Sequence, residues 1–356
     1  MMKRKVNKMK KKCDLIKRLK NGECARVLLY HHIDLDGYGT LVLMKYLEKL
    51  FPNLELYTIE CDTDAERISI DNDKMCLFNF DYIFIADLSV KTKETAELIY
   101  KLNDSKKLNV YIVDHHETAL WLDKFEYATI VPHDLDNNVV TCGTSLLFDL
   151  IKGDTKTCEL DNGWIIDFIK NVKEYDTFLW KLNGNKQAYD LNLLLKFSDD
   201  KNKFVKDIVE TLNNTTYVLG YYDTQNSLRL SIYSDIIKNE IELAEKMYNK
   251  INIIYKGKEL VCGYLYINKY QSEIGNAICE KHNDIDFMMM INANNGKVSF
   301  RSTKNNINLT EFVKPLGGGG HKSAAGCELP LNKYNCSIEE TLSCILNEIK
   351  QENKEE

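Results

Sequence analysis

The chain has little proline, no paired-cysteine motif and no long apolar run. Only four of its 356 residues are proline. Its eleven cysteines are an odd number, and no two have the Cys-x-x-Cys spacing, which argues against a disulfide framework and a zinc knuckle. Phe287–Ile291 is among the longest apolar stretches, far shorter than a membrane-spanning helix. We therefore expect a folded cytoplasmic protein with reduced, mostly buried cysteines and no membrane segment.

The chain also lacks an excess of positive charge. Its formal net charge of −6 excludes a uniformly basic surface for nucleic acid, although it is compatible with a local basic groove. Met1–Lys20 is dense in lysine and arginine, but no apolar segment of the signal-peptide kind follows it. Residues 1–24 are therefore interpreted as a basic N-terminal extension, and its charge run as a solvated tail rather than a clamp for RNA.

Strand-like and helix-like stretches alternate over the first half of the chain. This alternation is typical of parallel strands joined by helical crossovers. A mainly parallel sheet with helices on both faces is therefore predicted for residues 25–195, in an α/β domain. The expected strands are Arg26–Tyr30, Leu54–Ile59, Tyr82–Ala86, Leu108–Val113 and Ala128–Val131, and the expected helices are Gly39–Leu50, Thr95–Leu102 and Thr144–Ile151.

The second half of the chain has a different pattern. Residues 196–250 are polar and acidic, with helical periodicity in Ile236–Met247, and are interpreted as a helical connector. From residue 251 the pattern becomes that of an antiparallel sheet with two hairpin turns, Lys256-Gly257-Lys258 and Asn294-Asn295-Gly296. Residues 251–350 are therefore predicted to form a smaller α+β domain, and 356 residues suit such a two-domain chain.

Polar side chains follow three of the predicted strands at the point where each strand ends. The triplet Asp114-His115-His116 follows one strand, Asp87 follows another, and His31–Gly37 follows the first. The carboxyl ends of parallel strands meet at one edge of the sheet, where ligands bind in open α/β folds. Carboxylates and imidazoles from three strands are therefore expected at one edge.

The spacing of these side chains indicates a metal centre. Asp34 and Asp36 stand two apart before Gly37, so on an extended backbone their carboxylates can face two neighbouring cations. Asp87 could bridge the pair, and His115 could complete the second ion. Mixed carboxylate and imidazole ligands suit manganese, and also magnesium or zinc.

These motifs resemble those of the DHH phosphoesterases, a family named for the triplet. The resemblance runs from about Arg26 to Cys327 and includes an Asp in a short aromatic context, Glu174–Trp180, and a glycine run before a histidine, Gly317–Gly326. Within the family, the form of these motifs and the segment Ser272–Asn276 are most similar to oligoribonucleases of the nanoRNase B type. The resemblance implies a DHH domain, then a DHH-associated domain, with the active site in the interdomain cleft.

The resemblance further implies two cation sites in this chain. The implied ligands are His32, Asp34 and Asp87 for one ion, and Asp36, Asp87, His115 and Asp176 for the other. His116 would face the substrate phosphate as a catalytic residue, and Asp114 would fix the orientation of the neighbouring rings. His31 stays open as the register alternative to His32.

The far phosphate of the substrate would be bound in the C-terminal domain. Gly317–Gly320 matches neither a Walker A loop nor G-x-G-x-x-G, but four glycines can present consecutive N–H groups to an anion ahead of a helix. A flexible surface loop is the alternative, as a solvated hairpin end is for Arg301, whose guanidinium could otherwise bind phosphate. The expected substrate-binding residues are Arg301, Ser302, Gly318, Gly319, Gly320 and His321.

The activity that the resemblance implies is hydrolysis of short single-stranded oligonucleotides, mainly RNA but also DNA, to nucleoside monophosphates. Two divalent cations, manganese before magnesium or other divalent ions, would activate the attacking water. No protein partner is implied, and a homodimer stays open. The alternatives are cleavage of cyclic or linear dinucleotides, dephosphorylation of 3′-phosphoadenosine 5′-phosphate, exonucleolytic degradation of single-stranded DNA and a non-catalytic nucleotide sensor.

Overall fold

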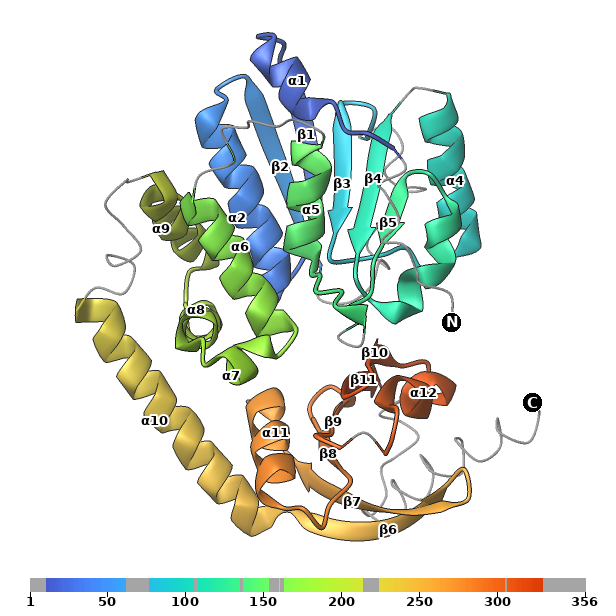
Figure 1. Cartoon of the computed structure of the whole chain (residues 1–356), viewed down its shortest axis with the longest axis vertical. Coiled ribbons are helices and arrows are strands. Elements are labelled where there is room, and N and C mark those ends of the chain that lie inside the picture. The colour runs from blue at the N-terminus through green and yellow to red at the C-terminus, as the bar shows by residue number, and fades with distance from the viewer. Residues whose placement is uncertain are drawn as a thin grey trace. The chain divides into compact units, whose positions relative to one another are not determined.

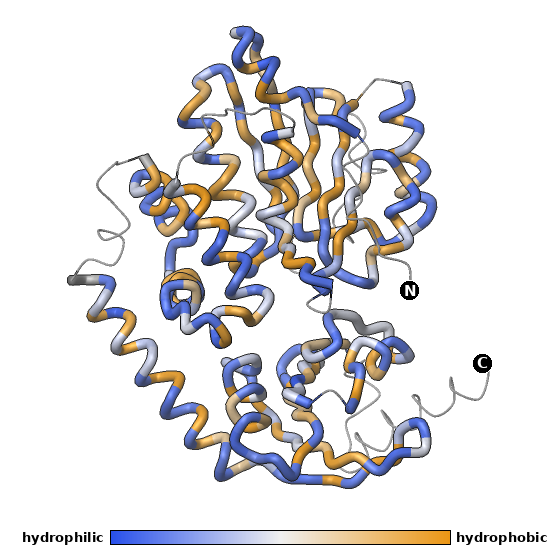
Figure 2. The backbone as a smooth tube through the Cα atoms, viewed as in Figure 1, coloured by the Kyte–Doolittle hydropathy of each residue, from blue (hydrophilic) through white to orange (hydrophobic). Residues whose placement is uncertain are grey.

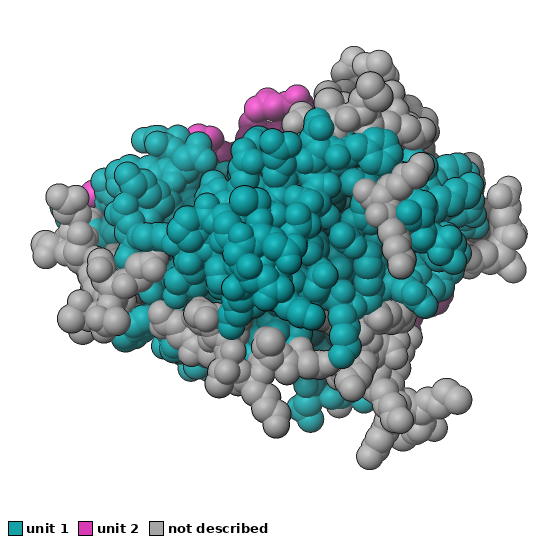
Figure 3. All heavy atoms as spheres, turned by 90° about the horizontal axis from the view of Figure 1, so that it is seen from above, with its two compact units in different colours: residues 1–230 teal, residues 231–356 magenta. Residues whose placement is uncertain are grey.

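The structure is a computed structural model that describes residues 11–61, 77–105, 108–134, 137–153, 160, 163–213, 224–304 and 306–328. The chain divides into two compact units, residues 1–230 and residues 231–356, which Figure 3 shows in different colours. Each unit is described by itself below. The predicted end of the second domain, at residue 350, lies outside the described residues.

Unit 1 is built on a five-stranded sheet in which every neighbouring pair of strands is parallel. The predicted parallel sheet is therefore confirmed. Its order is β2-β1-β3-β4-β5 (Figure 1). Figure 2 shows that the inner strands β1, β3 and β4 are mainly hydrophobic, as expected for strands that are buried on both faces. The strands are β1 (Ala25–His32), β2 (Leu54–Cys61), β3 (Tyr82–Ala86), β4 (Asn109–Asp114) and β5 (Ala128–Ile130).

Helices cover this sheet, and two of them begin at the edge that carries the predicted site. α2 begins at Leu35, earlier than the predicted Gly39, because Asp34 caps it by accepting the Gly37 N–H at 3.0 Å. The helices of unit 1 are α1 (Leu15–Lys20), α2 (Leu35–Leu50), α4 (Lys93–Asp104), α5 (Gly143–Lys152), α6 (Gly163–Asp176), α7 (Leu179–Asn183), α8 (Lys186–Lys196) and α9 (Lys201–Asn213), with a 3₁₀ helix η1 (Glu117–Lys124).

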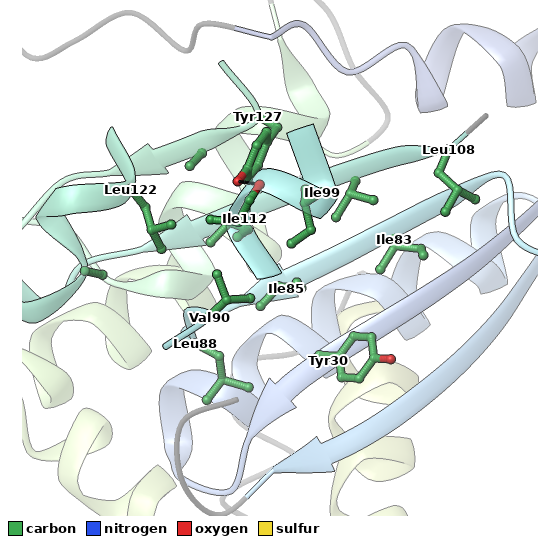
Figure 4. Packing of buried hydrophobic residues seen from close by; sticks show 14 of the residues in the cluster. Tyr30, Ile83, Ile85, Leu88, Val90, Ile99, Leu108, Ile112, Leu122 and Tyr127 are labelled. Carbon is green, nitrogen blue, oxygen red and sulfur yellow. Dashed lines mark hydrogen bonds between the residues drawn. The ribbon is translucent and has the colours of Figure 1, made fainter. Parts of the chain in front are cut away.

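One face of the sheet packs into a continuous apolar cluster (Figure 4). Ile85 of β3 and Ile112 of β4 are completely buried there, together with Ile99 of α4. Tyr127 is also buried, and its hydroxyl donates to the carbonyl of Ala96 at 2.7 Å, so its polar end is satisfied. Burial of such side chains contributes roughly 1.5 to 3 kcal/mol each, which gives the strands a rigid base for the residues at their ends.

The described part of the basic N-terminal extension packs against the rest of unit 1. Leu15, Ile16 and Leu19 of α1 are buried. Before this helix, Asp14 accepts a hydrogen bond from the Tyr82 hydroxyl at 2.7 Å, and the Lys11 ammonium lies 4.7 Å from the centre of the Tyr111 ring. The expectation of a solvated tail is therefore wrong from Lys11 to Lys20, while residues 1–10 lie outside the described residues.

Unit 2 contains a six-stranded sheet of order β10-β11-β9-β8-β7-β6. The predicted hairpins are present, and Lys256 and Gly257 both have positive φ, as a two-residue hairpin turn favours. One pair departs from the predicted antiparallel pattern: β7 and β8 are parallel, because α11 carries the chain back between them. The strands are β6 (Asn249–Tyr255), β7 (Lys258–Tyr266), β8 (Phe287–Ile291), β9 (Lys297–Arg301), β10 (Gly319–His321) and β11 (Ala324–Glu328).

The helices of unit 2 are short apart from the long helix at its beginning. They are α10 (Thr224–Met247), whose first residues belong to unit 1, α11 (Gln271–Lys281), α12 (Leu309–Val313) and a 3₁₀ turn η3 (Lys314–Leu316). Among the described residues of both units, none of the helices combines the length and the apolar character needed to span a bilayer.

Candidate metal centre

The acidic and histidine residues predicted from the strand ends gather at the carboxyl edge of the unit 1 sheet. β1 lies between β2 and β3, so the connections that leave β1 and β3 run to opposite sides. Ligands of open α/β sheets bind where the strand order reverses in this way. His32 ends β1, Asp87 follows β3, and Asp114 ends β4. The topology thus brings three of the predicted motifs together.

The first group of possible ligands consists of His32, Asp34 and Asp87. The Nδ1 atom of His32 lies 2.8 Å from Asp34 Oδ2 and 3.9 Å from Asp87 Oδ2. The side chains of His32 and Asp34 are 27% and 49% exposed, so this group is open to solvent. Gly37 allows the tight connection into α2, because a Cβ there would lie 2.1 Å from the carbonyl oxygen of His32.

The second group consists of Asp36, His115 and Asp176 and is more deeply buried. His115 Nε2 lies 3.6 Å from Asp36 Oδ2 and 3.2 Å from Asp87 Oδ1, and His115 Nδ1 lies 3.5 Å from Asp176 Oδ2. Asp87 therefore approaches both groups. Asp176 is the last residue of α6 and is brought in by that helix rather than by a strand.

Asp114 acts on its two neighbours in the triplet. Its Oδ1 accepts the backbone N–H groups of His115 and His116 at 2.7 and 3.2 Å, and also accepts the ring Nδ1–H of His116 at 2.7 Å. Asp114 is 1% exposed. The carboxylate thus holds the backbone of His115 and the ring of His116, and it leaves Nε2 of His116 as the ring nitrogen that points away from Asp114.

The carboxylates of the centre repel one another, and a bound cation would neutralise part of their negative charge. Burial and the neighbouring carboxylates of Asp36 and Asp34 raise the pKa values of Asp87 and Asp176 well above the ordinary value. In the part of the chain that the structure describes, Asp87 Oδ2 and Asp176 Oδ2 are buried and accept no hydrogen bond. Buried carboxylate oxygens are normally paired or bound to metal. The donor set therefore fits divalent cations.

The two histidines of the triplet have opposite electrostatics. Burial lowers the pKa of His115 to about 4, so its ring is neutral and suited to bind metal. Burial alone would lower the pKa of His116 as well, but the charge and hydrogen bond of Asp114 raise it to about 10. Asp114 therefore favours the imidazolium form of His116. The two adjacent rings thus differ in their preferred charge, neutral for His115 and positive for His116.

The structure separates His31 from His32. His31 is 2% exposed, its Nδ1 lies 3.0 Å from the carbonyl oxygen of His32, and its ring makes an edge contact with Tyr38. Among the described residues, His31 joins none of the acid and histidine groups that could hold a metal, whereas His32 does. The register alternative is thus the one that faces away from the centre.

Sequence reasoning missed two residues at the start of α5. The backbone N–H of Thr144 donates to Asp36 Oδ1 at 2.8 Å, and that of Gly143 donates to Asp36 Oδ2. Both carboxylate oxygens of Asp36 are thereby held. The sequence offered one signal. The predicted strand Ala128–Val131 ends at the same edge of the sheet as the other ligands, so the next predicted helix, Thr144–Ile151, begins near that edge.

In unit 2, Arg301 ends β9, and its guanidinium is held by the protein. Nη2 donates to Ser272 Oγ at 2.6 Å, and Nη1 donates to the Phe300 carbonyl at 2.7 Å. α11 passes close by, since a Cβ on Gly275 would lie 3.0 Å from Arg301 Cγ. The first turn of α11 therefore orients this side chain.

Ser302 and part of the glycine run have structural partners. Ser302 is 3% exposed, and its hydroxyl donates to the Asp286 carbonyl at 2.7 Å, so it lies inward rather than toward a ligand. Gly317 has a φ of +69° and caps the preceding helical turn. The N–H groups of Gly317 and Gly318 donate to Lys314 and Val313 carbonyls, each at 3.0 Å, so these two amides do not form the expected anion nest.

The expected helix after the glycines is a strand. Gly319, Gly320 and His321 form β10, which pairs with β11. A Cβ on Gly318 would lie 2.4 Å from the carbonyl oxygen of Gly326, so close backbone packing explains this glycine. The glycine run therefore leads into a tight hairpin, and His321 is the last residue of its first strand.

Two family models match the chain. The model of the DHH family, N-terminal domain, matches residues 26–170, and the model of the DHHA1 domain matches residues 257–355. The Oligoribonuclease NrnB of Bacillus subtilis (strain 168) is 26% identical over 323 residues, which cover 88% of this chain and 75% of the relative.

Two solved structures have the same fold. Exonuclease RecJ bound to manganese matches with a TM-score of 0.51 at 13% identity, covering 98% of this chain and 96% of that chain. RecJ of Thermus thermophilus in complex with Mn²⁺ matches with a TM-score of 0.53 at 15% identity, covering 95% of this chain and 54% of that chain. At these identities the likeness shows the fold alone.

Proposed function

Since this chain belongs to the DHH family and carries a DHHA1 domain after its DHH domain, we propose that it hydrolyses phosphodiester bonds in short single-stranded oligonucleotides, releasing nucleoside monophosphates. One observation carries the proposal. Carboxylates and imidazoles from three strand ends and one helix end converge in unit 1, and two buried carboxylate oxygens among them accept no hydrogen bond in the described residues. The named activity of the NrnB relative supports the substrate class.

The proposed cofactor is a pair of divalent cations. Two groups of possible ligands support this proposal, His32 with Asp34 and Asp87, and Asp36 with His115 and Asp176, and Asp87 approaches both. Manganese suits this mixture of carboxylate and imidazole donors, and magnesium is the alternative. When bound, such cations lower the pKa of a coordinated water and neutralise charge on the phosphoryl group.

His116 is the proposed proton donor. Asp114 holds the Nδ1–H of its ring at 2.7 Å and favours the charged form of the imidazole. The Nε2–H of that imidazolium would donate to a phosphoryl oxygen or to the departing oxygen of the leaving nucleoside. Asp114 is thus a positioning residue, and His116 is the catalytic one.

Unit 2 is proposed to bind the distal phosphate of the substrate. Arg301, oriented by Ser272, and His321, carried on the glycine hairpin, supply the positive and hydrogen-bonding groups. Gly319 and Gly320 place no side chain beside His321. We assign Ser302, Gly317 and Gly318 the role of supporting this surface. A requirement for a distal phosphate would favour short oligonucleotides with a free end.

The test is a substrate panel with a matched pair of variants. Purified protein with Mn²⁺ is incubated with labelled dinucleotides to decanucleotides of RNA and DNA, a cyclic dinucleotide and 3′-phosphoadenosine 5′-phosphate. We expect monophosphate release to be fastest from the shortest RNA substrates and to be lost in Asp87→Asn. Asp167→Asn, which removes an exposed carboxylate from α6, is the control. Preference for another member of the panel, or no turnover of any, would contradict the proposal.

A further inference from the structure

The first turn of α5 contacts two of the proposed metal ligands at once. Gly143 and Thr144 donate their N–H groups to the two carboxylate oxygens of Asp36. The Thr144 hydroxyl adds a third bond, to the backbone carbonyl of Asp36 at 2.7 Å. Asp36 is 1% exposed and Thr144 is completely buried, so these bonds form away from water, where charge-assisted hydrogen bonds are strongest.

On its other side, the same turn presses against Asp87. A Cβ added to Gly143 would lie 2.5 Å from the Asp87 Cβ and 2.8 Å from its Cα and N atoms. These atoms belong to the backbone of Asp87 or are bonded directly to it, so they cannot swing away. Asp87 itself has a φ of +59°, a left-handed conformation that is uncommon for residues other than glycine. The bend at Asp87 and the absence of a side chain at Gly143 therefore fit one another.

We propose that Gly143 and Thr144 are positioning residues that set the spacing between Asp36 and Asp87, and thereby the spacing of the two cations. The inference rests on the proposed metal centre. Asp36 belongs to α2 and Asp87 follows β3, so they come from separate elements. Carboxylates that repel one another hold a defined geometry only when their surroundings are rigid. The first turn of α5 touches both of them through backbone groups and the Thr144 hydroxyl.

A purely structural role gives a different expectation. If Asp36 only caps α5, removal of these contacts lowers the stability of the fold but leaves the affinity for cations unchanged. The two roles are therefore separated by a binding measurement, which does not depend on activity.

The central variant is Thr144→Val, which keeps the shape of the side chain and removes its hydroxyl. Metal-free full-length protein is titrated with Mn²⁺ by calorimetry. We expect Thr144→Val to weaken Mn²⁺ binding about tenfold, the lower end of the range for residues that orient a metal ligand. Thr144→Ser, which keeps the hydroxyl, should bind Mn²⁺ as the wild type does.

Thr40→Val is the matched control. Thr40 is also completely buried, and its hydroxyl donates to the Gly37 carbonyl at 2.6 Å, so its loss removes the same kind of bond from α2. We expect it to cost stability but to keep the Mn²⁺ affinity. The inference is overturned if Thr144→Val binds Mn²⁺ like the wild type, or if Thr40→Val weakens binding equally.

Gly143→Ala tests the contact with Asp87. The added methyl group must push α5 away from the backbone of Asp87, so we expect a larger loss of Mn²⁺ affinity than in Thr144→Val. Electron paramagnetic resonance of the Mn²⁺-loaded protein reports the spacing directly, because the coupling of two Mn²⁺ ions weakens as they separate. An unchanged coupling in a folded Gly143→Ala protein contradicts the inference. Should this variant not fold, the comparison at Thr144 decides alone.

The outcome also distinguishes the inference from the proposed function. A wild-type protein that binds no Mn²⁺, Mg²⁺ or Zn²⁺ would overturn the metal centre and everything that rests on it. Equal Mn²⁺ affinity in the wild type and Thr144→Val would overturn the positioning role alone.

Discussion

The proposed metal centre of unit 1 and the proposed phosphate-binding surface of unit 2, with Arg301 and His321, differ in how their polar groups are paired. In the described part of unit 1, buried oxygens of Asp87 and Asp176 accept no hydrogen bond. In unit 2, the Ser302 hydroxyl and the N–H groups of Gly317 and Gly318 bond to the protein's own backbone. The two carboxylate oxygens of the first site fit a bound cation, whereas these three groups of the second site already have partners within the protein. We expect substitutions in unit 1 to affect catalysis and those in unit 2 to affect binding or stability.

Asp87→Asn should have the largest effect. The substitution keeps the size of the side chain but removes the charge from the residue that approaches both ligand groups. We expect the kcat for a dinucleotide to fall by more than about 100-fold, since residues that only orient a ligand already cost 10- to 100-fold. A kcat near the wild-type value with Mn²⁺ in this variant would contradict the expectation that substitutions in the unit 1 centre affect catalysis.

His116→Gln should lower kcat by about 100-fold, as expected for the loss of a general acid, while His115→Gln should weaken Mn²⁺ binding. The acid form of His116 is lost as the pH rises through its pKa. Since that pKa is about 10 without metal and bound cations lower it, the alkaline decline of kcat should lie at or below pH 10 and should be absent from His116→Gln. Identical pH profiles for the two proteins would exclude His116 as the acid.

Arg301→Ala should raise the KM for dinucleotides by about 10- to 100-fold, because the guanidinium that would bind the distal phosphate is removed. Each tenfold step corresponds to about 1.4 kcal/mol of lost binding. The kinetics of bis-p-nitrophenyl phosphate, which has no distal phosphate, should change little. Arg301→Lys should recover part of the loss, since lysine keeps the charge but not the two-pronged geometry. Equal losses on both substrates would show that Arg301 does not select the distal phosphate.

Ser302→Ala should have the smallest effect, and this effect should be on stability alone. It leaves the Asp286 carbonyl without its 2.7 Å partner, which should lower the free energy of unfolding by about 1 to 2 kcal/mol. Urea denaturation measures this change, and the KM for dinucleotides should stay at the wild-type value. A raised KM without a loss of stability would restore Ser302 as a substrate ligand.

The parts of the fold that follow from local pattern could be predicted from the sequence. The apolar runs located all five described strands of unit 1, and the polar residues directly after them located His32, Asp87 and the triplet. The direction of each strand then placed these residues at one edge. Asp176 lies at a helix end, where no strand pattern indicates it, and only the family resemblance suggested it.

The remainder depends on contacts that no local pattern reveals. Asp36 and Gly143 are 107 positions apart, and nothing near either of them names the other. From the sequence, the glycine run indicates conformational freedom but not the structure that needs it. In the structure, Gly317 caps a helical turn, and Gly319 and Gly320 lie in a tight hairpin. The parallel pairing of β7 with β8 likewise depends on where α11 leads the chain.

The wide separation of the ligands along the chain also bears on how the protein folds. Three contacts of the centre join positions 32 and 87, 115 and 176, and 36 and 143. Each contact closes a long loop, which costs entropy before the contact can form, so the centre assembles only after the strands have met. Local segments supply only part of each ligand group, so in a refolding experiment the uptake of Mn²⁺ should be a late step that reports the completed sheet.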